Sequence, residues 1–562
     1  MPKKYDYSGW SKEDLIKRVH ELEKRKKYGL VWDEEREPEK VVLRCKKELP
    51  VLKEVKEKEI KNDPDKPTHI LIEGDNYHAL SVLNYTHENS VDVIYIDPPY
   101  NTGAKDWKYN NNYVDENDAY RHSKWLNFMN NRLKISKNLL TNDGVLICTI
   151  DHNELNTLGL LLKDIFPDKE ITCITIVHNP SGIQGKNFSH NNEYAYFVHA
   201  PNKKVIATEV RSEEDADVRQ FMNTAKGNTN NYLRESGKDC FYPIYVQDDN
   251  IIGFGDVCAS DFHPSGSNIT RPDGTIEIYP IDSEGTERKW VFARKSVESI
   301  IDELSVKYNS KRQTYEIIRT KKNINYKTVW VDSKLNAKSY GTELLKNILK
   351  KEFPFPKSLY AVMQCISAVI HKKEKSIILD FFAGSGTTGH AVLEMNKNDG
   401  GNRQFILVTN NENGIAEEIC FPRIKHVIEG YDFSGTTKNV LYEEKLNIRK
   451  LKKIDSILEK YETIKREQKE RYDEIKSEFK DNTIRLIGLN KNQTRMKGLG
   501  GNLKYYKTDF VPAESTDLNK EKLTKQSVEM LCLRENTFEP VLEDGPIKIF
   551  QNKEKYTAIL FD

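Results

Sequence analysis

Several features are missing from this sequence, and each absence excludes a class of protein. No stretch approaches the roughly 20 apolar residues of a membrane-spanning helix, and the first residues include lysines but no apolar signal core. The eight cysteines form no C-x-x-C pair and no cluster with histidine at metal-ligand spacing. We therefore expect a cytoplasmic protein with no membrane contact, disulfide framework or bound metal.

The sequence also lacks an excess of either charge. Its 87 lysines and arginines balance 86 aspartates and glutamates, which gives a formal net charge of +1. This balance excludes a uniformly basic surface, so contact with nucleic acid would need local basic patches. Residues 121–132 and 312–327 are the candidates, and a solvated basic face is the alternative for both.

Short apolar runs alternate with helical patterns in two regions of the chain. Residues 70–74, 91–97 and 144–151 have the composition of buried strands, and the alternation returns from about residue 355, with strands at 376–382 and 404–410. Strands and helices alternating at this spacing favour a parallel sheet covered by helices on both faces. The sequence therefore predicts an α/β fold.

The remaining segments differ in composition and give the predicted domain boundaries. The α/β regions are expected at 65–200 and 331–435, and a loop-rich insert with antiparallel strands is expected between them, at 201–330. Before them, residues 1–64 are expected to be helical or a linker, with 46–61 as an exposed helix or linker. After them, we expect charged helices or a short coiled coil at 436–480 and a mixed α and β region at 481–562.

The sharpest motif is Asp97-Pro98-Pro99-Tyr100, which follows the predicted strand 91–97. Ligands of open α/β sheets bind beyond the carboxyl ends of strands, so the motif lies where a site is expected. The prolines carry no N–H, and the carbonyls and the carboxylate can only accept hydrogen bonds. This set of acceptors suits an exocyclic amine, with Tyr100 placed to stack on its ring. The alternative is a turn that merely ends a strand.

A second motif runs from Asp380 to Gly389 (DFFAGSGTTG), between a predicted strand and a helix. Its glycines allow close approach of the backbone to a ligand, and a helix N-terminus points N–H groups at it. The spacing Gly384-x-Gly386-x-x-Gly389 also fits a dinucleotide fingerprint, so a nicotinamide-dependent oxidoreductase is an alternative. A phosphate-loop NTPase is a poorer alternative, because His390-Ala391 stands where Lys-Ser/Thr is required. Glu412, after the next strand, is a candidate for gripping ribose hydroxyls, or is an ordinary loop acid.

Asp-Pro-Pro-Tyr followed much later by Phe382-Ala383-Gly384-Ser385-Gly386 resembles the amino DNA methyltransferases that use S-adenosylmethionine, in their circularly permuted beta class. Gly74-Asp75, the segments 143–154 and 192–194, and Phe353 to Lys357 resemble further blocks of that family. Together with the tail 498–506, they make the chain similar to the Mod subunits of type III restriction-modification systems.

The resemblance implies a Rossmann-like methyltransferase sheet, circularly permuted, with an inserted target-recognition domain and helical additions at both ends of the chain. It also implies methyl transfer from S-adenosylmethionine to adenine N6 in a short motif of double-stranded DNA, after the base has flipped out of the duplex. Cytosine N4 is the alternative, whereas cytosine C5 is excluded because no Pro-Cys pair is present.

The resemblance assigns roles to two groups of residues. The catalytic residues would be Asp97, Pro98, Pro99 and Tyr100. The cofactor would contact Asp75 near its adenine, Lys357 near its methionine end, and Asp380, Phe382, Ala383, Gly384, Gly386, Thr388 and Glu412.

The implied partners are DNA in the nucleoid, a second copy of the chain, and a separate ATP-dependent restriction (Res) subunit for any cleavage. The absence of a phosphate-loop helicase motif is the reason to expect cleavage from another chain.

Overall fold

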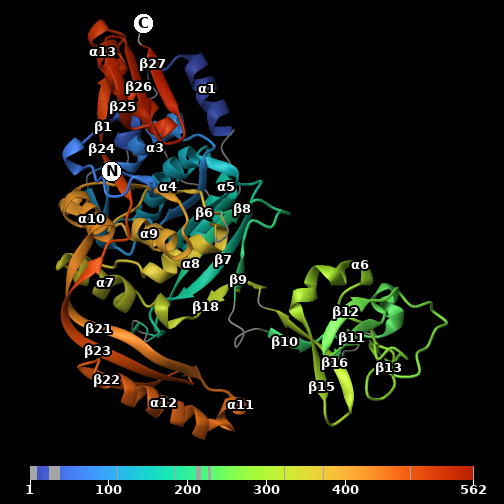
Figure 1. Ribbon diagram of the computed structural model, residues 1–562. Coiled ribbons are helices and arrows are strands. Elements are labelled where there is room, and N and C mark those ends of the chain that lie inside the picture. The colour runs from blue at the N-terminus through green and yellow to red at the C-terminus, as the bar shows by residue number, and fades with distance from the viewer. Residues whose placement is uncertain are drawn as a thin grey trace. The chain divides into compact units, whose positions relative to one another are not determined.

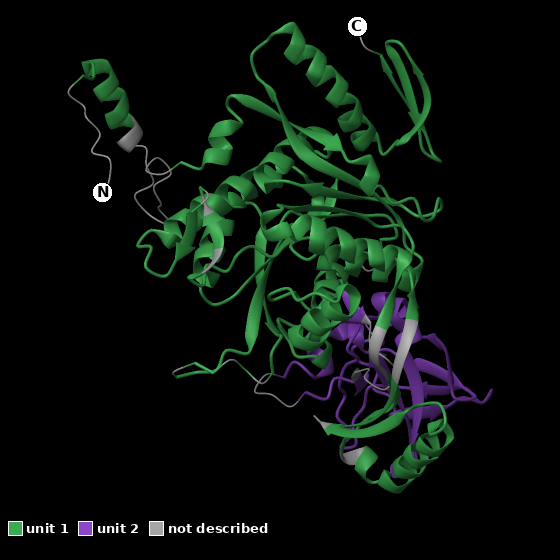
Figure 2. Ribbon diagram, turned by 90° about the vertical axis from the view of Figure 1, so that its left-hand side faces the viewer, with its two compact units in different colours: residues 1–207, 327–562 green, residues 208–326 purple. Residues whose placement is uncertain are grey.

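The structure is a computed structural model of the 562-residue chain (Figure 1). It describes residues 9–23, 38–110, 112–180, 182, 184–185, 187–210, 217–225, 230–321, 323–370, 373–480 and 482–560. The chain divides into two compact units, one made of residues 1–207 and 327–562 and the other of residues 208–326 (Figure 2).

A ten-stranded mixed sheet forms the centre of the first unit (Figure 1). The six central strands run parallel, and antiparallel pairings of β1 with β24, and of β8 with β6 and β7, extend the sheet on either side. The strand order is β1 (Glu48–Glu54), β24 (Asn502–Pro512), β2 (Thr68–Glu73), β20 (Gln404–Thr409), β19 (Ile377–Asp380), β3 (Val91–Ile96), β6 (Leu140–Ile150), β8 (Asn192–His199), β7 (Glu170–Val177) and β18 (Val329–Trp330).

Helices cover both faces of this sheet, because the central strands are apolar on both sides. Ile70 and Ile72 belong to the core beneath one layer, while Leu71 between them is equally buried on the other side. One layer contains α3 (Asn76–Thr86), α4 (Arg121–Lys137) and α5 (Leu155–Ile165), and the other contains α8 (Leu359–Ile370), α9 (Thr387–Asp399) and α10 (Phe421–Glu429) (Figure 1). The predicted α/β fold is confirmed.

Two predicted segments differ from the structure. Residues 46–61 were predicted as an exposed helix or linker, but residues 48–54 form β1, whose Val51 and Leu52 are buried. Across residues 46–61 charged residues outnumber apolar ones. Pairing of 48–54 with β24, which is distant in sequence, decides the conformation. Within 436–480, the predicted helices are present as α11 (Ile448–Leu451) and α12 (Ile454–Gln468), but β21 (Gly430–Lys445) and β22 (Glu474–Lys480) flank them as strands.

The second unit contains short antiparallel strands, as expected for residues 201–330. Strands β10 (Asp217–Gln220), β16 (Thr314–Lys321) and β15 (Leu304–Asn309) form one sheet, and β12 (Asn250–Phe254), β11 (Ile244–Gln247), β14 (Ile276–Ile278) and β13 (Asn268–Thr270) form another. Phe221, Tyr242 and Trp290 lie in its own apolar core. A separate core of this kind lets the unit fold around its own side chains.

Among the helices that the structure describes, none combines the length and apolar character needed to cross a bilayer.

Candidate active site

A cavity of about 1530 Å³ lies in the first unit, beyond the carboxyl ends of β2, β3, β19 and β20. Asp97 follows β3 and Asp380 ends β19, and these two strands are parallel neighbours although half the chain separates them. The cavity is therefore at the sheet edge where open α/β folds bind ligands. Every predicted site residue lines it except Gly386.

The Asp97 loop is anchored from both sides. Thr149 on β6 donates a hydrogen bond to Asp97 Oδ1 (2.6 Å), and Trp125 on α4 donates to the Pro99 carbonyl (2.7 Å). Asn101, fully buried with a left-handed φ of 57°, donates to the buried carboxylate of Glu154 (2.5 Å). Asparagine tolerates this conformation better than most residues. These contacts fix the Asp97 carboxylate toward the cavity.

Lys357 contacts two residues of the Asp97 loop, Asp97 and Tyr100, as well as Glu193. Its ammonium is 2.5 Å from Glu193 Oε2 and 3.2 Å from Asp97 Oδ1, and it also donates to the Tyr100 hydroxyl. Burial alone would lower the pKa of Lys357, but the carboxylates of Asp97 and Glu193 more than offset burial and raise it. Burial would likewise raise the pKa of Glu193, but Lys357 and His178 hold it below its usual value. Lys357 and Glu193 are therefore a charged, buried ion pair.

The glycine-rich turn has the geometry of a helix N-terminus facing the cavity. Gly386 is the N-cap of α9 with a φ of +79°, and a Cβ there would lie 3.1 Å from Cys420 Sγ. Gly384 has a φ of +50°, and a Cβ there would meet only the Phe382 carbonyl, at 3.8 Å. Gly386 is thus required by the protein's own packing, whereas Gly384 leaves open space next to the cavity.

Asp380 fixes the start of this turn. Its carboxylate accepts hydrogen bonds from the Phe382 amide (2.9 Å) and from the Thr388 hydroxyl (2.5 Å). Burial raises the pKa of Asp380 to about 7, and the nearby Asp97 charge acts in the same direction, although both hydrogen bonds oppose the shift. This carboxyl group therefore changes charge near neutral pH.

We expect a pH-dependent contribution of Asp380 to stability. Because its pKa is raised in the folded state, the stabilisation is fully present below pH ~4 and is lost as the pH rises through about 7. Asp380→Asn removes the titration while its amide can still accept from Phe382 and donate to Thr388. Urea unfolding at pH 5.5, 7.0 and 8.5 should show wild type losing stability relative to the variant as the pH rises. Parallel profiles would contradict the assignment.

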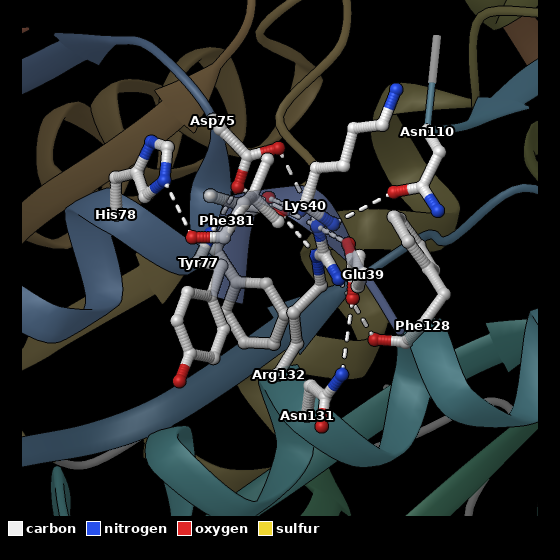
Figure 3. Close-up of polar contacts among 12 residues, drawn as sticks. Glu39, Lys40, Asp75, Tyr77, His78, Asn110, Phe128, Asn131, Arg132 and Phe381 are labelled. Carbon is white, nitrogen blue, oxygen red and sulfur yellow. Dashed lines mark hydrogen bonds and ion pairs between the residues drawn. The ribbon is translucent and has the colours of Figure 1, made fainter. Parts of the chain in front are cut away.

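Asp75 also lines the cavity, and it belongs to a charged network (Figure 3). It caps α3 by accepting from the Tyr77 amide (2.8 Å), and Arg132 of α4 lies 3.4 Å from it. Arg132, 1% exposed, also pairs with Glu39 (2.7 Å) and donates to Asn76, whose amide donates to the Phe381 carbonyl (3.0 Å). The network joins the N-terminal segment, α4 and the glycine-rich turn.

Arg132 was predicted within a basic patch at 121–132, but its side chain is buried, which excludes contact with nucleic acid.

Loss of Arg132 should destabilise the protein because it leaves the carboxylate of Glu39, 5% exposed, buried without its cation. We expect Arg132→Met to lower the free energy of unfolding by about 3–5 kcal/mol. The double variant Glu39→Gln/Arg132→Met should recover part of that loss, since no buried charge is then unpaired. Urea unfolding of wild type, of the two single variants Glu39→Gln and Arg132→Met, and of the double variant checks this, and strictly additive losses would refute it.

Glu412, the predicted ribose contact, lies at the rim of the cavity. Its side chain is 44% exposed and forms an ion pair with Lys108 of β4 (Ala104–Tyr109) at 3.3 Å. A carboxylate so placed is reachable from the cavity, and its ribose role stays a prediction.

Sequence comparison decides between the two alternatives for the glycine-rich turn. A model of the N6_N4_Mtase family, described as DNA methylase, matches residues 91–419, more than half of the chain. The chain belongs to this DNA methylase family. It is a DNA methyltransferase, and the oxidoreductase alternative is wrong.

Relatives of this chain include a type II methyltransferase and the Mod subunits of type III restriction-modification enzymes. The chain is 31% identical to the type II methyltransferase M.KpnI of Klebsiella pneumoniae, over 60% of this chain and 79% of that protein. It is 30% identical to the Mod subunit of the type III enzyme EcoPI of Escherichia phage P1, over 61% of this chain but only 58% of that subunit. The chain thus spans just over half the length of that Mod subunit.

Among solved structures, the complex of M1.HpyAVI with S-adenosylmethionine is 13% identical, with a TM-score of 0.29, over 63% of this chain and 98% of that chain. A similarity at this TM-score carries no argument about this site.

Sequence reasoning missed three residues that the structure brings to the Asp97 loop or to Lys357. Thr149, Trp125 and Glu193 come from β6, α4 and β8, and each bonds to a residue of the Asp97 loop or to Lys357. Glu193 belongs to a segment that resembled a family block, yet nothing in that block indicated a charge partner for Lys357. Only the fold reveals these contacts, since the elements are distant in sequence.

Proposed function

We propose that this methyltransferase transfers the methyl group of S-adenosylmethionine to the N6 amine of adenine within a short DNA motif. The single observation that supports it most is the placement of the Asp97 carboxylate and the Pro98 carbonyl in one cavity with the glycine-rich turn. Two acceptors near each other match an amine with two hydrogens to donate. The turn opposite them offers the room and the helix N-terminus that the cofactor needs.

The protein's own groups would act mainly by positioning. An amine conjugated to a ring is a poor nucleophile, and hydrogen bonds to Asp97 and Pro98 favour a more pyramidal nitrogen with its lone pair available. Tyr100 would hold the flipped base against its ring. When bound, S-adenosylmethionine supplies a sulfonium-linked methyl group. The amine nitrogen would take this methyl group while the electron pair of the carbon–sulfur bond stays on sulfur, and the surplus amine proton would leave to solvent. Asp97 would stabilise the positive charge that develops on the nitrogen.

We propose the following roles for the residues that line the cavity. Asp97, Pro98, Pro99 and Tyr100 form the catalytic loop, and Asp75, Lys357, Asp380, Phe382, Ala383, Gly384, Thr388 and Glu412 form the cofactor side. Gly386 supports the cofactor turn from behind. Cytosine N4 is the second candidate target, because the same two acceptors would serve its amine.

We further propose a circularly permuted order, with the catalytic half at 65–200, recognition in the unit at 208–326 and the cofactor half at 331–435. The chain would act as the modification subunit of a type III system or as a solitary relative of one. Action as a homodimer and a separate restriction subunit for cleavage belong to the same proposal. Its support is the similarity to the Mod subunits.

Long-read sequencing of DNA from cells with and without the gene tests the function. We expect one short motif to gain N6-methyladenine, and the mark to be absent with the Asp97→Asn variant. A motif that gains N4-methylcytosine instead would establish the second candidate. If neither mark appears with the folded wild-type protein, the proposed function is wrong.

A further inference from the structure

The ammonium of Lys357 is a positive charge next to the place where the proposed reaction develops a second positive charge, on the target amine. Its ammonium lies 3.2 Å from Asp97 Oδ1, the carboxylate that would receive the target amine, and Lys357 is only 13% exposed. The transferred methyl group carries positive charge to the amine nitrogen. An ammonium held on Asp97 would neutralise the carboxylate and repel the developing charge, strongly so in a site shielded from water.

Glu193 is placed to prevent this neutralisation. Its Oε2 is 2.5 Å from the Lys357 ammonium, closer than Asp97, and the carboxylate is 5% exposed. The Tyr100 hydroxyl donates to the same oxygen at 3.0 Å. Glu193 therefore holds both Lys357 and Tyr100 on the side of the loop facing β8, while Thr149 holds Asp97 from β6.

We propose that Glu193 is a positioning residue for methyl transfer: it keeps the ammonium of Lys357 as its own counter-ion, so that Asp97 retains its negative charge for the target amine. In the free enzyme the lysine bridges both carboxylates. When the amine binds to Asp97, the lysine stays with Glu193. This inference rests on the proposed function, because it concerns the amine that Asp97 would bind.

Four chains test the proposal: wild type, Glu193→Gln, Lys357→Met and the double variant. Glutamine can still accept from Tyr100 and Lys357, so Glu193→Gln removes the charge while preserving the shape. The double variant removes both charges and restores the net charge of the site. Each chain is given unmethylated genomic DNA and S-adenosylmethionine with a labelled methyl group, at saturating cofactor. The single-turnover transfer rate is measured, with the cofactor Kd and the thermal midpoint recorded in parallel.

We expect Glu193→Gln to slow transfer by about 10- to 100-fold, because Lys357 then pairs with Asp97 alone. The double variant should be several-fold faster than Glu193→Gln, and Glu193→Asp, which keeps the charge, should remain close to wild type. A purely structural ion pair would shift the thermal midpoint but leave the transfer rate of the folded chains unchanged, and that result overturns the proposal.

Two further outcomes also count against the inference. A double variant as slow as Glu193→Gln, or slower, overturns it while leaving the proposed function intact, provided that wild type methylates the DNA. If wild type itself transfers no methyl group to DNA, the proposed function fails and the inference fails with it. Should Glu193→Gln not fold, the double variant is compared with Lys357→Met. Without the ammonium there is nothing for Glu193 to hold away from Asp97, so the two chains should transfer at equal rates, and a double variant more than about threefold slower than Lys357→Met overturns the proposal.

Discussion

Asp97→Asn should slow methyl transfer by about 10²–10³-fold or more, with the cofactor Kd within about twofold of wild type. Asparagine can keep the hydrogen bond from Thr149, so the loop retains its shape. It loses the negative charge that stabilises the amine nitrogen as positive charge develops there. Because this interaction exists mainly in the transition state, the loss falls on the rate rather than on binding.

The matched control is Asp92→Asn, on β3, the strand that Asp97 follows. Asp92 accepts from the Ile377 amide (3.0 Å) and pairs with Lys373 (3.3 Å) at the opposite end of β3, and it does not line the cavity. We expect its transfer rate to stay within about twofold of wild type, since surface ion pairs contribute little. Single-turnover incorporation of labelled methyl into DNA and calorimetric titration with S-adenosylmethionine measure the two quantities. A rate for Asp97→Asn within tenfold of wild type would remove Asp97 from the catalytic role.

Gly384→Val should raise the cofactor Kd by about 30-fold or more, equivalent to about 2 kcal/mol. A Cβ at Gly384 meets no protein atom closer than 3.8 Å, and the residue lines the cavity. The added side chain therefore extends into the cavity, where the cofactor would bind. The φ of +50° also strains a β-branched residue.

Gly400→Val is the control that separates the two effects. Gly400 ends the same helix, α9, with a φ of +74° and nothing within 4 Å of its Cβ position, but it lies outside the cavity lining. It carries the same backbone strain, so we expect lower stability with an unchanged Kd. Calorimetric titration of both variants decides: equal Kd values would show that the turn does not border the cofactor.

The strands of the central sheet and both motifs could be predicted because their signals are local. Runs such as 91–97 are apolar on both faces, which is the pattern of a strand buried between two layers. The prolines after Asp97 restrict the backbone through their ring, and the glycines after Asp380 leave the backbone free because they lack a side chain. Neither motif needs a distant contact to be recognised.

Residues 48–54 show where this reasoning fails. Three of its seven residues are charged, and it becomes a strand because β24, from the other end of the chain, offers it hydrogen bonds, while Val51 and Leu52 are buried. Tertiary pairing of this kind overrides the weak local preference of a charged strand.

By itself, the sequence determined the α/β class, the strand-end position of Asp97 and the glycine-rich turn, since each depends on residues adjacent in the chain. Tertiary structure alone decided that β3 and β19 are neighbours, so that both motifs open into one cavity. It also decided that Lys357 bridges Asp97 and Glu193. Ion pairing depends on distance in space, and three segments far apart in sequence meet there only because the sheet brings the ends of its strands together.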